Sequence, residues 1–117
     1  MSASSRQPLR ELVERWEQIA SHVERGYALT FDDYLNDLDL RRLIDERIRA
    51  IGDWRSSAIP KSLSVALASA DDLFRQATTA SAENVWGADN ERDEGWNAER
   101  QWYYYRWPKS TPKWGRS

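Results

Sequence analysis

The stretch from residue 9 to residue 23 carries the clearest folding signal in the chain. Its apolar residues recur at steps of three and four, which places them along one stripe of an α-helix. Charged and amide side chains occupy the rest of the helix surface. Such a helix gains most of its stability by burying its stripe against other elements, so it requires partner helices. The stripe consists of Leu9, Leu12, Val13, Trp16, Ile19, Ala20 and Val23.

A second helix is predicted between residues 31 and 51. Thr30 followed by Asp33 is an acidic form of the capping box, which marks the start of a helix. The apolar stripe changes phase at Arg41 and Arg42, where apolar residues would be needed to continue it. Because acidic residues lie three and four positions away, both arginines have the pattern of helix-surface ion pairs. We therefore expect a kinked or broken second helix, with one continuous helix as the alternative.

The third helix is predicted to begin at Pro60, a residue that favours the first turn of a helix. Its apolar stripe extends to Ala77, and the pattern allows the helix to continue to Trp86. Alanine is frequent in this stripe, which indicates close approach to a neighbouring helix.

These patterns predict an all-α fold, a small antiparallel bundle of three main helices with the second kinked or broken. We expect residues 1–107 to form a single helical domain and residues 108–117 a basic, partly flexible tail. A C-terminal segment rich in tryptophan and tyrosine is expected to pack on the bundle or to extend from it. The predicted core comprises Leu12, Val13, Trp16, Ile19, Val23, Tyr34, Leu35, Leu38, Leu43, Ile44, Ile48, Leu63, Leu67, Ala70, Leu73 and Phe74.

Composition narrows the class of protein. Cysteine is absent, which excludes disulfides, thiolate metal sites and cysteine nucleophiles. No apolar run reaches the ~18 residues of a membrane-spanning helix, and the N-terminus lacks a secretory signal. We therefore expect a cytoplasmic protein without a membrane partner.

Motifs typical of catalysis are missing from the sequence. It has no phosphate-binding glycine loop, nucleophile-elbow serine or zinc-binding histidine pair. His22 is the only histidine, and a position on the surface of the first helix accounts for it. The acidic residues 89–94 lack the glycine and the glutamate that a calcium loop needs, so we expect a solvent-exposed loop there. These absences favour a non-enzymatic protein that holds no cofactor and no metal.

The C-terminal segment combines aromatic and basic residues. The chain has seven tryptophans and five tyrosines, and much of this aromatic content follows residue 85. Large rings are common anchors of protein interfaces, so we predict contacts with a protein partner or a second copy through Trp102, Tyr104, Arg106 and Trp107. The alternative is that the rings cover the helical stripes, because a soluble monomer must hide large apolar surfaces.

Charge is distributed unevenly along the chain. Residues 1–100 contain all 19 acidic and 13 of the 17 basic residues, whereas residues 101–117 contain four basic residues and no acidic one. Aromatic rings interleaved with cations can bind nucleic acid. Four charges are few, however, and the acidic body would repel a polyanion. Nucleic-acid binding through the tail is therefore the third and weakest hypothesis.

A second candidate group lies around the start of the second helix. Tyr27, Asp33, Tyr34, Asp37 and Arg41 would form a pocket between helices if their side chains converge. Paired carboxylates with tyrosine and arginine can act in acid–base chemistry or ligand binding. This group supports the alternative hypothesis, a small enzyme or ligand-binding helical protein.

The main functional hypothesis is a non-enzymatic protein-interaction module of the immunity-protein, antitoxin or adaptor type. It depends on the acidic body, on the missing catalytic motifs and on the aromatic C-terminal segment as the contact surface. The expected behaviour is binding to a protein partner, for which a basic surface would be complementary.

Overall fold

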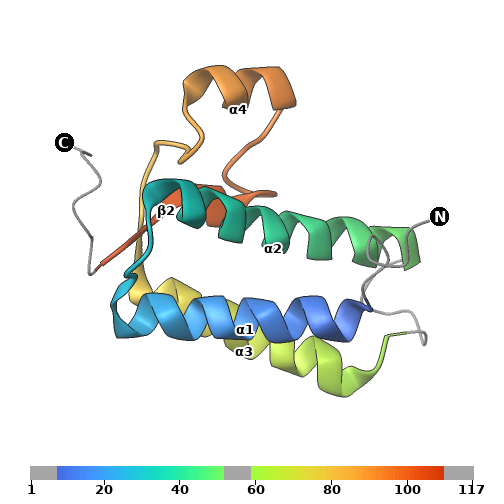
Figure 1. Cartoon of the computed structure of the whole chain (residues 1–117). Helices are drawn as coiled ribbons and strands as arrows, with labels where there is room; N and C mark the ends of the chain where they lie inside the picture. The colour runs from blue at the N-terminus through green and yellow to red at the C-terminus, as the bar shows by residue number, and fades with distance from the viewer. Residues whose placement is uncertain (1–7, 52–58, 110–117) are drawn as a thin grey trace.

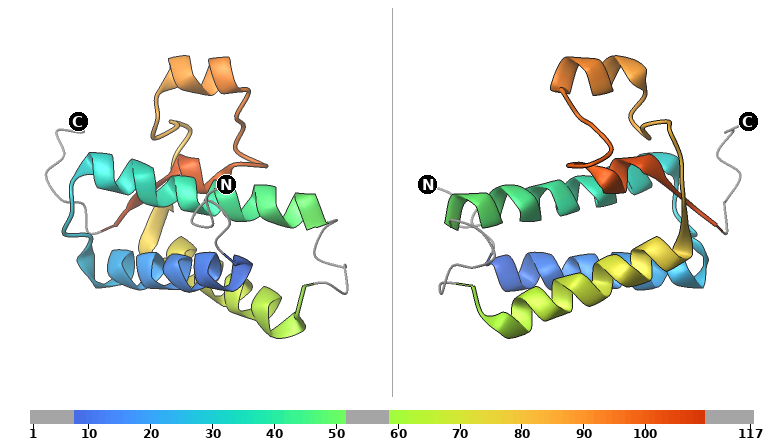
Figure 2. Two further views of the ribbon diagram at one scale, coloured as in Figure 1. Left: turned by 45° about the vertical axis from the view of Figure 1, so that its right-hand side comes forward. Right: turned by 180° about the vertical axis from the view of Figure 1, so that it is seen from behind.

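The structure is a computed structural model that describes residues 8–51 and 59–109. Three long helices, α1 (Leu9–Gly26), α2 (Phe31–Ile51) and α3 (Lys61–Ala77), form its body. In Figure 1, α2 runs antiparallel above α1, and α3 lies against α1 on the side away from the viewer. The view from behind in Figure 2 shows the same arrangement with α3 in front.

The C-terminal part of the chain adds short elements to this body. The strands β1 (Thr78–Ala80) and β2 (Arg106–Pro108) pair antiparallel, and Thr79 lies opposite Trp107. Between them lie the short helix α4 (Ala88–Glu94) and the 3₁₀ helix η2 (Trp102–Tyr105). The fold is therefore mainly helical, and the predicted all-α class is only roughly right. A three-helix bundle is not confirmed as its full description.

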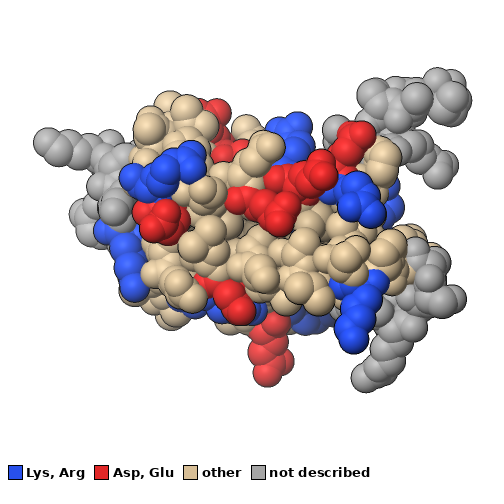
Figure 3. Space-filling view, turned by 90° about the horizontal axis from the view of Figure 1, so that it is seen from below, with Lys and Arg blue, Asp and Glu red and all other residues tan. Residues whose placement is uncertain are grey.

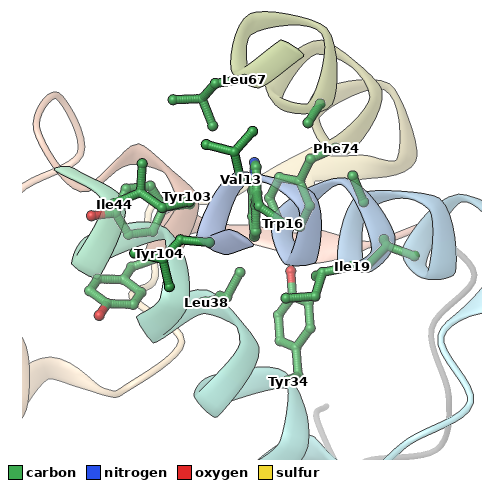
Figure 4. Close-up of a cluster of buried hydrophobic side chains, with 14 of the residues drawn as sticks. Val13, Trp16, Ile19, Tyr34, Leu38, Ile44, Leu67, Phe74, Tyr103 and Tyr104 are labelled. Atoms are coloured by element: carbon green, nitrogen blue, oxygen red, sulfur yellow. The ribbon is translucent and has the colours of Figure 1, made fainter. Parts of the chain in front are cut away.

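The core lies where the three long helices meet the 3₁₀ helix. Trp16 of α1 is fully buried, and its ring centre lies 4.9 Å from that of Phe74 of α3. Tyr103 and Tyr104 of η2 enter the same cluster from the other side, next to Ile44 of α2 (Figure 4). The stripe predicted for the first helix is buried from Leu12 onward, whereas Leu9 is only partly buried.

The predicted break in the second helix is wrong, because α2 is one continuous helix. Its buried face passes from Tyr34 through Leu38 and Arg41 to Ile44 and Ile48, at the steps of three and four that one helix face requires. Arg41 thus occupies the core position at which the apolar stripe is interrupted. It is not the surface residue that the sequence suggested, since only 5% of it is exposed.

Three other expectations need correction. Leu43 was predicted to lie in the core but is 39% exposed, because it lies about 100° around the helix from Ile44. Leu73 is only half-buried. The third helix ends at Ala77 and does not continue to Trp86, because Thr78 adopts an extended conformation and its hydroxyl donates to the Phe74 carbonyl at 2.7 Å.

The residues expected to form an acidic loop are also helical. Positions 88–94 form α4, which ends at Gly95 with a left-handed φ of 72°, a conformation that favours glycine. Most of the predicted tail lies outside the described residues, which reach only Lys109. Within the described ranges, the helices are too short or too polar to cross a membrane.

Candidate functional site

The predicted contact segment is largely built into the fold. Tyr104 is fully buried. Its hydroxyl donates to Asp39 at 2.5 Å and accepts from the Arg42 Nε–H at 3.0 Å. Trp102 is half-buried, and the Arg75 guanidinium carbon lies 3.9 Å from its ring centre. Of these two predicted contact residues, only Trp102 therefore keeps surface that a partner could reach.

Arg106 holds the two strands and the end of α3 together. Its guanidinium donates to the Thr78 hydroxyl at 2.7 Å, to the Thr78 carbonyl at 3.1 Å and to the Arg75 carbonyl at 3.1 Å. Its own carbonyl accepts a 2.7 Å hydrogen bond from the Tyr34 hydroxyl. Trp107 is half-buried and stacks on Phe31 at 5.8 Å between ring centres. Both residues thus help to attach the C-terminal segment to the helices.

Three consecutive tyrosines attach the segment through carboxylates. The hydroxyl of Tyr103 donates to Asp45 at 3.2 Å, and the hydroxyl of Tyr105 donates to Glu91. Tyr104 donates to its own carboxylate partner, as described above. Burial is the main cause that raises the pKa of each of the three hydroxyls, and the carboxylates raise it further. The neutral hydroxyls therefore act as donors throughout the neutral pH range.

The predicted pocket group is only partly brought together. The Tyr27 hydroxyl donates to Asp37 at 2.5 Å, and the rings of Tyr27 and Tyr34 meet edge to face at 5.3 Å. Burial raises the pKa of Asp37 above its ordinary value of 3.8, and the hydrogen bond from Tyr27 lowers it by less. These three residues converge, but both hydroxyls already donate to acceptors within the protein.

The other two members of that group bond to other partners, although the charge of Asp33 also raises the pKa of Tyr27 and of Asp37. Asp33 closes the capping box at the start of α2: its carboxylate accepts from the Thr30 hydroxyl at 2.9 Å, and its N–H donates to that hydroxyl at 3.1 Å. Arg41 turns instead toward α3. The five residues therefore do not line one pocket together.

A buried charge centre around Arg41 was missed by the sequence analysis. Its Nε and Nη2 each donate to Asp71 at 2.9 Å, and its Nη1 donates to Asp45 at 2.5 Å. The Trp16 indole N–H donates to Asp71 at 2.8 Å. Burial alone would lower the pKa of Arg41, but the hydrogen bonds and charges of its carboxylate partners outweigh it and raise the pKa. Four elements, α1, α2, α3 and η2, meet at this centre.

A signal for this centre does exist in the sequence. Arg41 and Asp71 both lie at positions where the apolar stripe of their helix requires a buried residue. Opposite charges at buried positions of two helices favour each other, because a buried charge needs a partner. The two interrupted stripes, considered together, therefore indicate the pair of Arg41 and Asp71.

Beside this centre lies a cleft of about 240 Å³, lined by Arg41, Ser64, Leu67, Ala68 and Asp71. A second depression, of about 370 Å³, is formed by polar side chains of α1 alone, so it is open helix surface without a second wall. Among the described residues, no group of three or more potential metal ligands is found.

The chain from Ser81 to Gln101, which we call the arm, begins against the body, where Val85 is buried in the core, and then projects from it as α4. Figures 1 and 2 show α4 standing away from the three long helices in every view. None of the α4 residues is buried. Trp86 and Trp96 at the base of the arm are half-buried, and the ring of Trp96 lies 4.6 Å from that of Tyr104. The arm is thus anchored at its base and exposed along its helix.

No protein-family model, curated protein or solved structure matches the chain.

Proposed function

We propose that the chain is a non-enzymatic protein-interaction module whose contact surface is the arm, together with the half-buried tryptophans beside it. The observation that carries this proposal is α4 itself, a helix that projects from the body and buries none of its residues. A helix of seven residues is too short to be stable by itself in water. It contributes no buried side chain to the core, so a role in binding accounts for it better than a role in folding.

The base of the arm supports this interpretation because it is held in a defined position. The Tyr105 hydroxyl donates to Glu91 within α4, and the Trp96 N–H donates to the Glu91 carbonyl at 3.0 Å. The rings of Trp86 and Trp96 lie 6.3 Å apart. A surface that is already ordered loses less entropy when a partner binds.

The charge of the arm favours a basic partner. Residues 81–101 contain six acidic and two basic residues. The opposite face of the molecule, formed by α1 and α3, carries side chains of both signs next to one another (Figure 3). Charge complementarity speeds association and selects among partners, so a protein with lysine and arginine at its interface fits the arm best. The same charge disfavours nucleic acid at this surface.

The partner-binding residues predicted from the sequence are included only in part. Trp102 and Trp107 keep some exposed surface, whereas Tyr104 is fully buried and the Arg106 guanidinium bonds to the backbone and to Thr78. Ligand binding at Tyr27, Tyr34 and Asp37 remains the alternative hypothesis. It has weaker support, because these side chains already bond within the protein.

The proposal is tested by reversing charge on the exposed side of α4. In the variant Asp89→Lys/Asp93→Lys/Glu94→Lys, all three changed residues are exposed, so the fold should be retained. The intact protein is used to capture partners from an extract of its own cells, and the captured protein is then purified. Its affinity for the original chain and for the variant is measured by calorimetry. We expect the variant to bind at least tenfold more weakly.

The matched control places the same charge change on α1. Glu14, Glu17 and Glu24 are exposed there, and the variant Glu14→Lys/Glu17→Lys/Glu24→Lys should bind as tightly as the original chain. Equal affinity of the original chain and the arm variant would contradict the proposal. A loss of affinity of the same size in both variants would indicate a general charge effect and would also contradict it.

A further inference from the structure

Arg41 and Asp71 line a cleft and have hydrogen-bonding capacity that the described residues do not use. The cleft lies between α2 and α3 and is lined by none of the residues of the arm. Both charged residues line the cleft, yet their side chains are only 7% and 11% exposed. A charged pair so deeply buried has a nearly fixed position, and the cleft is where a ligand could reach it.

Arg41 uses only part of its donor capacity. An arginine side chain has five N–H donors, and the bonds to Asp71 and Asp45 account for three of them among the described residues. The guanidinium lies 5.9 Å from the ring centre of Trp102 and 5.7 Å from that of Tyr103, which restricts its rotation. Within the described ranges, two of its N–H donors therefore have no acceptor.

Asp71 likewise retains acceptor capacity. Each carboxylate oxygen can accept about two hydrogen bonds. Its Oδ1 accepts from both Trp16 and Arg41, whereas its Oδ2 accepts only from Arg41 in the part of the chain that the structure describes. One acceptor position on Oδ2 is thus available beside the free donors of Arg41.

The charges and the size of the cleft limit the ligand. One arginine and the two carboxylates of Asp45 and Asp71 sum to a negative charge, which disfavours an anion. The free N–H donors of Arg41 disfavour a cation. The volume of about 240 Å³ lies between a ~150 Å³ cavity that holds benzene and the ~300 Å³ at which pockets for drug-sized ligands begin. A neutral group of one ring or one short side chain fits.

We propose that this cleft binds a neutral amide edge, meaning a C=O and an N–H that point to the same side of a small molecule or side chain. The C=O accepts from the free N–H donors of Arg41, and the N–H donates to Oδ2 of Asp71. Leu67 and Ala68 of α3 contact the apolar remainder of the ligand. A lactam and the carboxamide of a glutamine side chain both carry this edge.

The first experiment follows binding through Trp16. Its indole N–H donates to Asp71, so its signal in a ¹H–¹⁵N spectrum of the ¹⁵N-labelled full chain reports on the cleft. The probe is δ-valerolactam, and the matched controls are N-methyl-δ-valerolactam, which lacks the N–H donor, and cyclohexanone, which keeps the C=O acceptor but has no nitrogen. We expect a saturable shift with the lactam and at least tenfold weaker binding of both controls. No saturable shift, or equal shifts with all three, would overturn the proposal.

The second experiment fills the cleft from its rim. Ala68 is exposed and lines the cleft, whereas its exposed neighbour Ser69 does not. We expect Ala68→Leu to weaken lactam binding at least tenfold, while Ser69→Leu leaves it unchanged. Both variants keep the buried charge centre, and the remaining signals of the spectrum show that the fold is intact. Unchanged binding in Ala68→Leu would place the lactam elsewhere and overturn the proposal.

A third experiment distinguishes the two sources of the amide, a small molecule and the side chain of a partner. Blocked Gly-Gln-Gly and Gly-Glu-Gly peptides are titrated under the same conditions. Tighter binding of the glutamine peptide than of the lactam, with no binding of the glutamate peptide, assigns the cleft to a partner side chain. Tighter binding of the lactam assigns it to a small molecule. Equal binding of the two peptides would contradict amide recognition.

Discussion

Asp71 accepts three hydrogen bonds, two from Arg41 and one from Trp16. The bidentate geometry toward Arg41 is the strong form of such a pair. A buried guanidinium needs this partner, because a charge that loses its partner in the interior keeps the whole cost of leaving water. Asp45 pairs with Arg41 as well, but Asp71 accepts two of its three bonds to carboxylates and the bond from Trp16, so much of the stability at this point of the core depends on Asp71.

We predict that Asp71→Asn destabilises the protein by about 3–5 kcal/mol, the typical cost of breaking a buried ion pair. The neighbouring Asp72 has a side chain that is 70% exposed and an ion-pair distance of 3.6 Å to Arg75. Asp72→Asn should therefore change the free energy of unfolding by no more than about 0.5 kcal/mol. Urea denaturation of both variants measures the difference, and similar values for the two would contradict the structural role of Asp71.

Residues of the candidate sites could be predicted from the sequence only where local rules decide them. The capping pair of Thr30 and Asp33 was predicted, and the structure contains it. The burial of Arg41 was not predicted, because the pattern within one helix cannot reveal an acidic partner that lies thirty positions away on another helix. The same limit explains why Tyr104 was assigned to an interface although it is fully buried.

At the scale of elements, α2 begins where its capping box predicts. The Thr30 hydroxyl accepts from the Asp33 N–H and donates to the Asp33 carboxylate. Such caps satisfy backbone donors that the first turn of a helix leaves without partners. The beginning of α2 is therefore stabilised by a pair of residues and not by either one separately.

A double-mutant cycle tests this coupling. Thr30→Ala should cost about 1 kcal/mol, a typical value for the loss of a helix cap. Asp33→Ala should cost a similar amount, and the double variant should cost clearly less than the sum, because both single changes remove the same contacts. Thermal or urea unfolding gives the three values. Strict additivity would show that the two side chains act independently.

The short elements were missed for a physical reason. A strand of three residues such as β1 is too short for an alternating pattern to be recognised. Its pairing partner, β2, lies more than twenty positions further along the chain, so no local turn signal connects them. The helix α4 has no apolar stripe, because it buries nothing. Elements of this kind depend on tertiary contacts that a single sequence does not display.

At the scale of the whole molecule, tyrosine rings cover the side of the core that the three long helices leave open. The three long helices supply apolar stripes, and the tyrosines of η2 cover them with fully or almost fully buried rings. The sequence left open whether these aromatic residues belong to the core or to an interface, and for the tyrosines the structure supports the core. The three helical regions were predicted because their signals extend over many turns, but the continuity of α2 and the end of α3 at Ala77 were not.

All five tyrosines of the chain should resist ionisation while the protein is folded. Burial raises the pKa of every one of them above 10.0, namely Tyr27, Tyr34, Tyr103, Tyr104 and Tyr105. The folded state therefore holds these protons when the unfolded state has released them, so stability is full below pH 10 and falls as the pH rises above it.

Absorbance at 295 nm and circular dichroism, followed together during an alkaline titration, measure this behaviour. We expect tyrosinate absorbance and loss of helix to appear in the same pH interval, above pH 10. In guanidinium chloride, all five tyrosines should ionise near pH 10. Reversible ionisation near pH 10 in a chain that keeps its helices would contradict the buried arrangement.

The side chain of Arg106 covers part of a strand edge at which chains could associate at high concentration. Its guanidinium donates to the Thr78 carbonyl, which faces away from β2 because the backbone bonds between the strands are made at the flanking residues Ala77 and Ser81. An open strand edge is a template on which further chains can stack into fibrils. With this acceptor already bonded, the β1–β2 pair offers one backbone group fewer to another chain, which makes it a poorer template for polymerisation at high concentration.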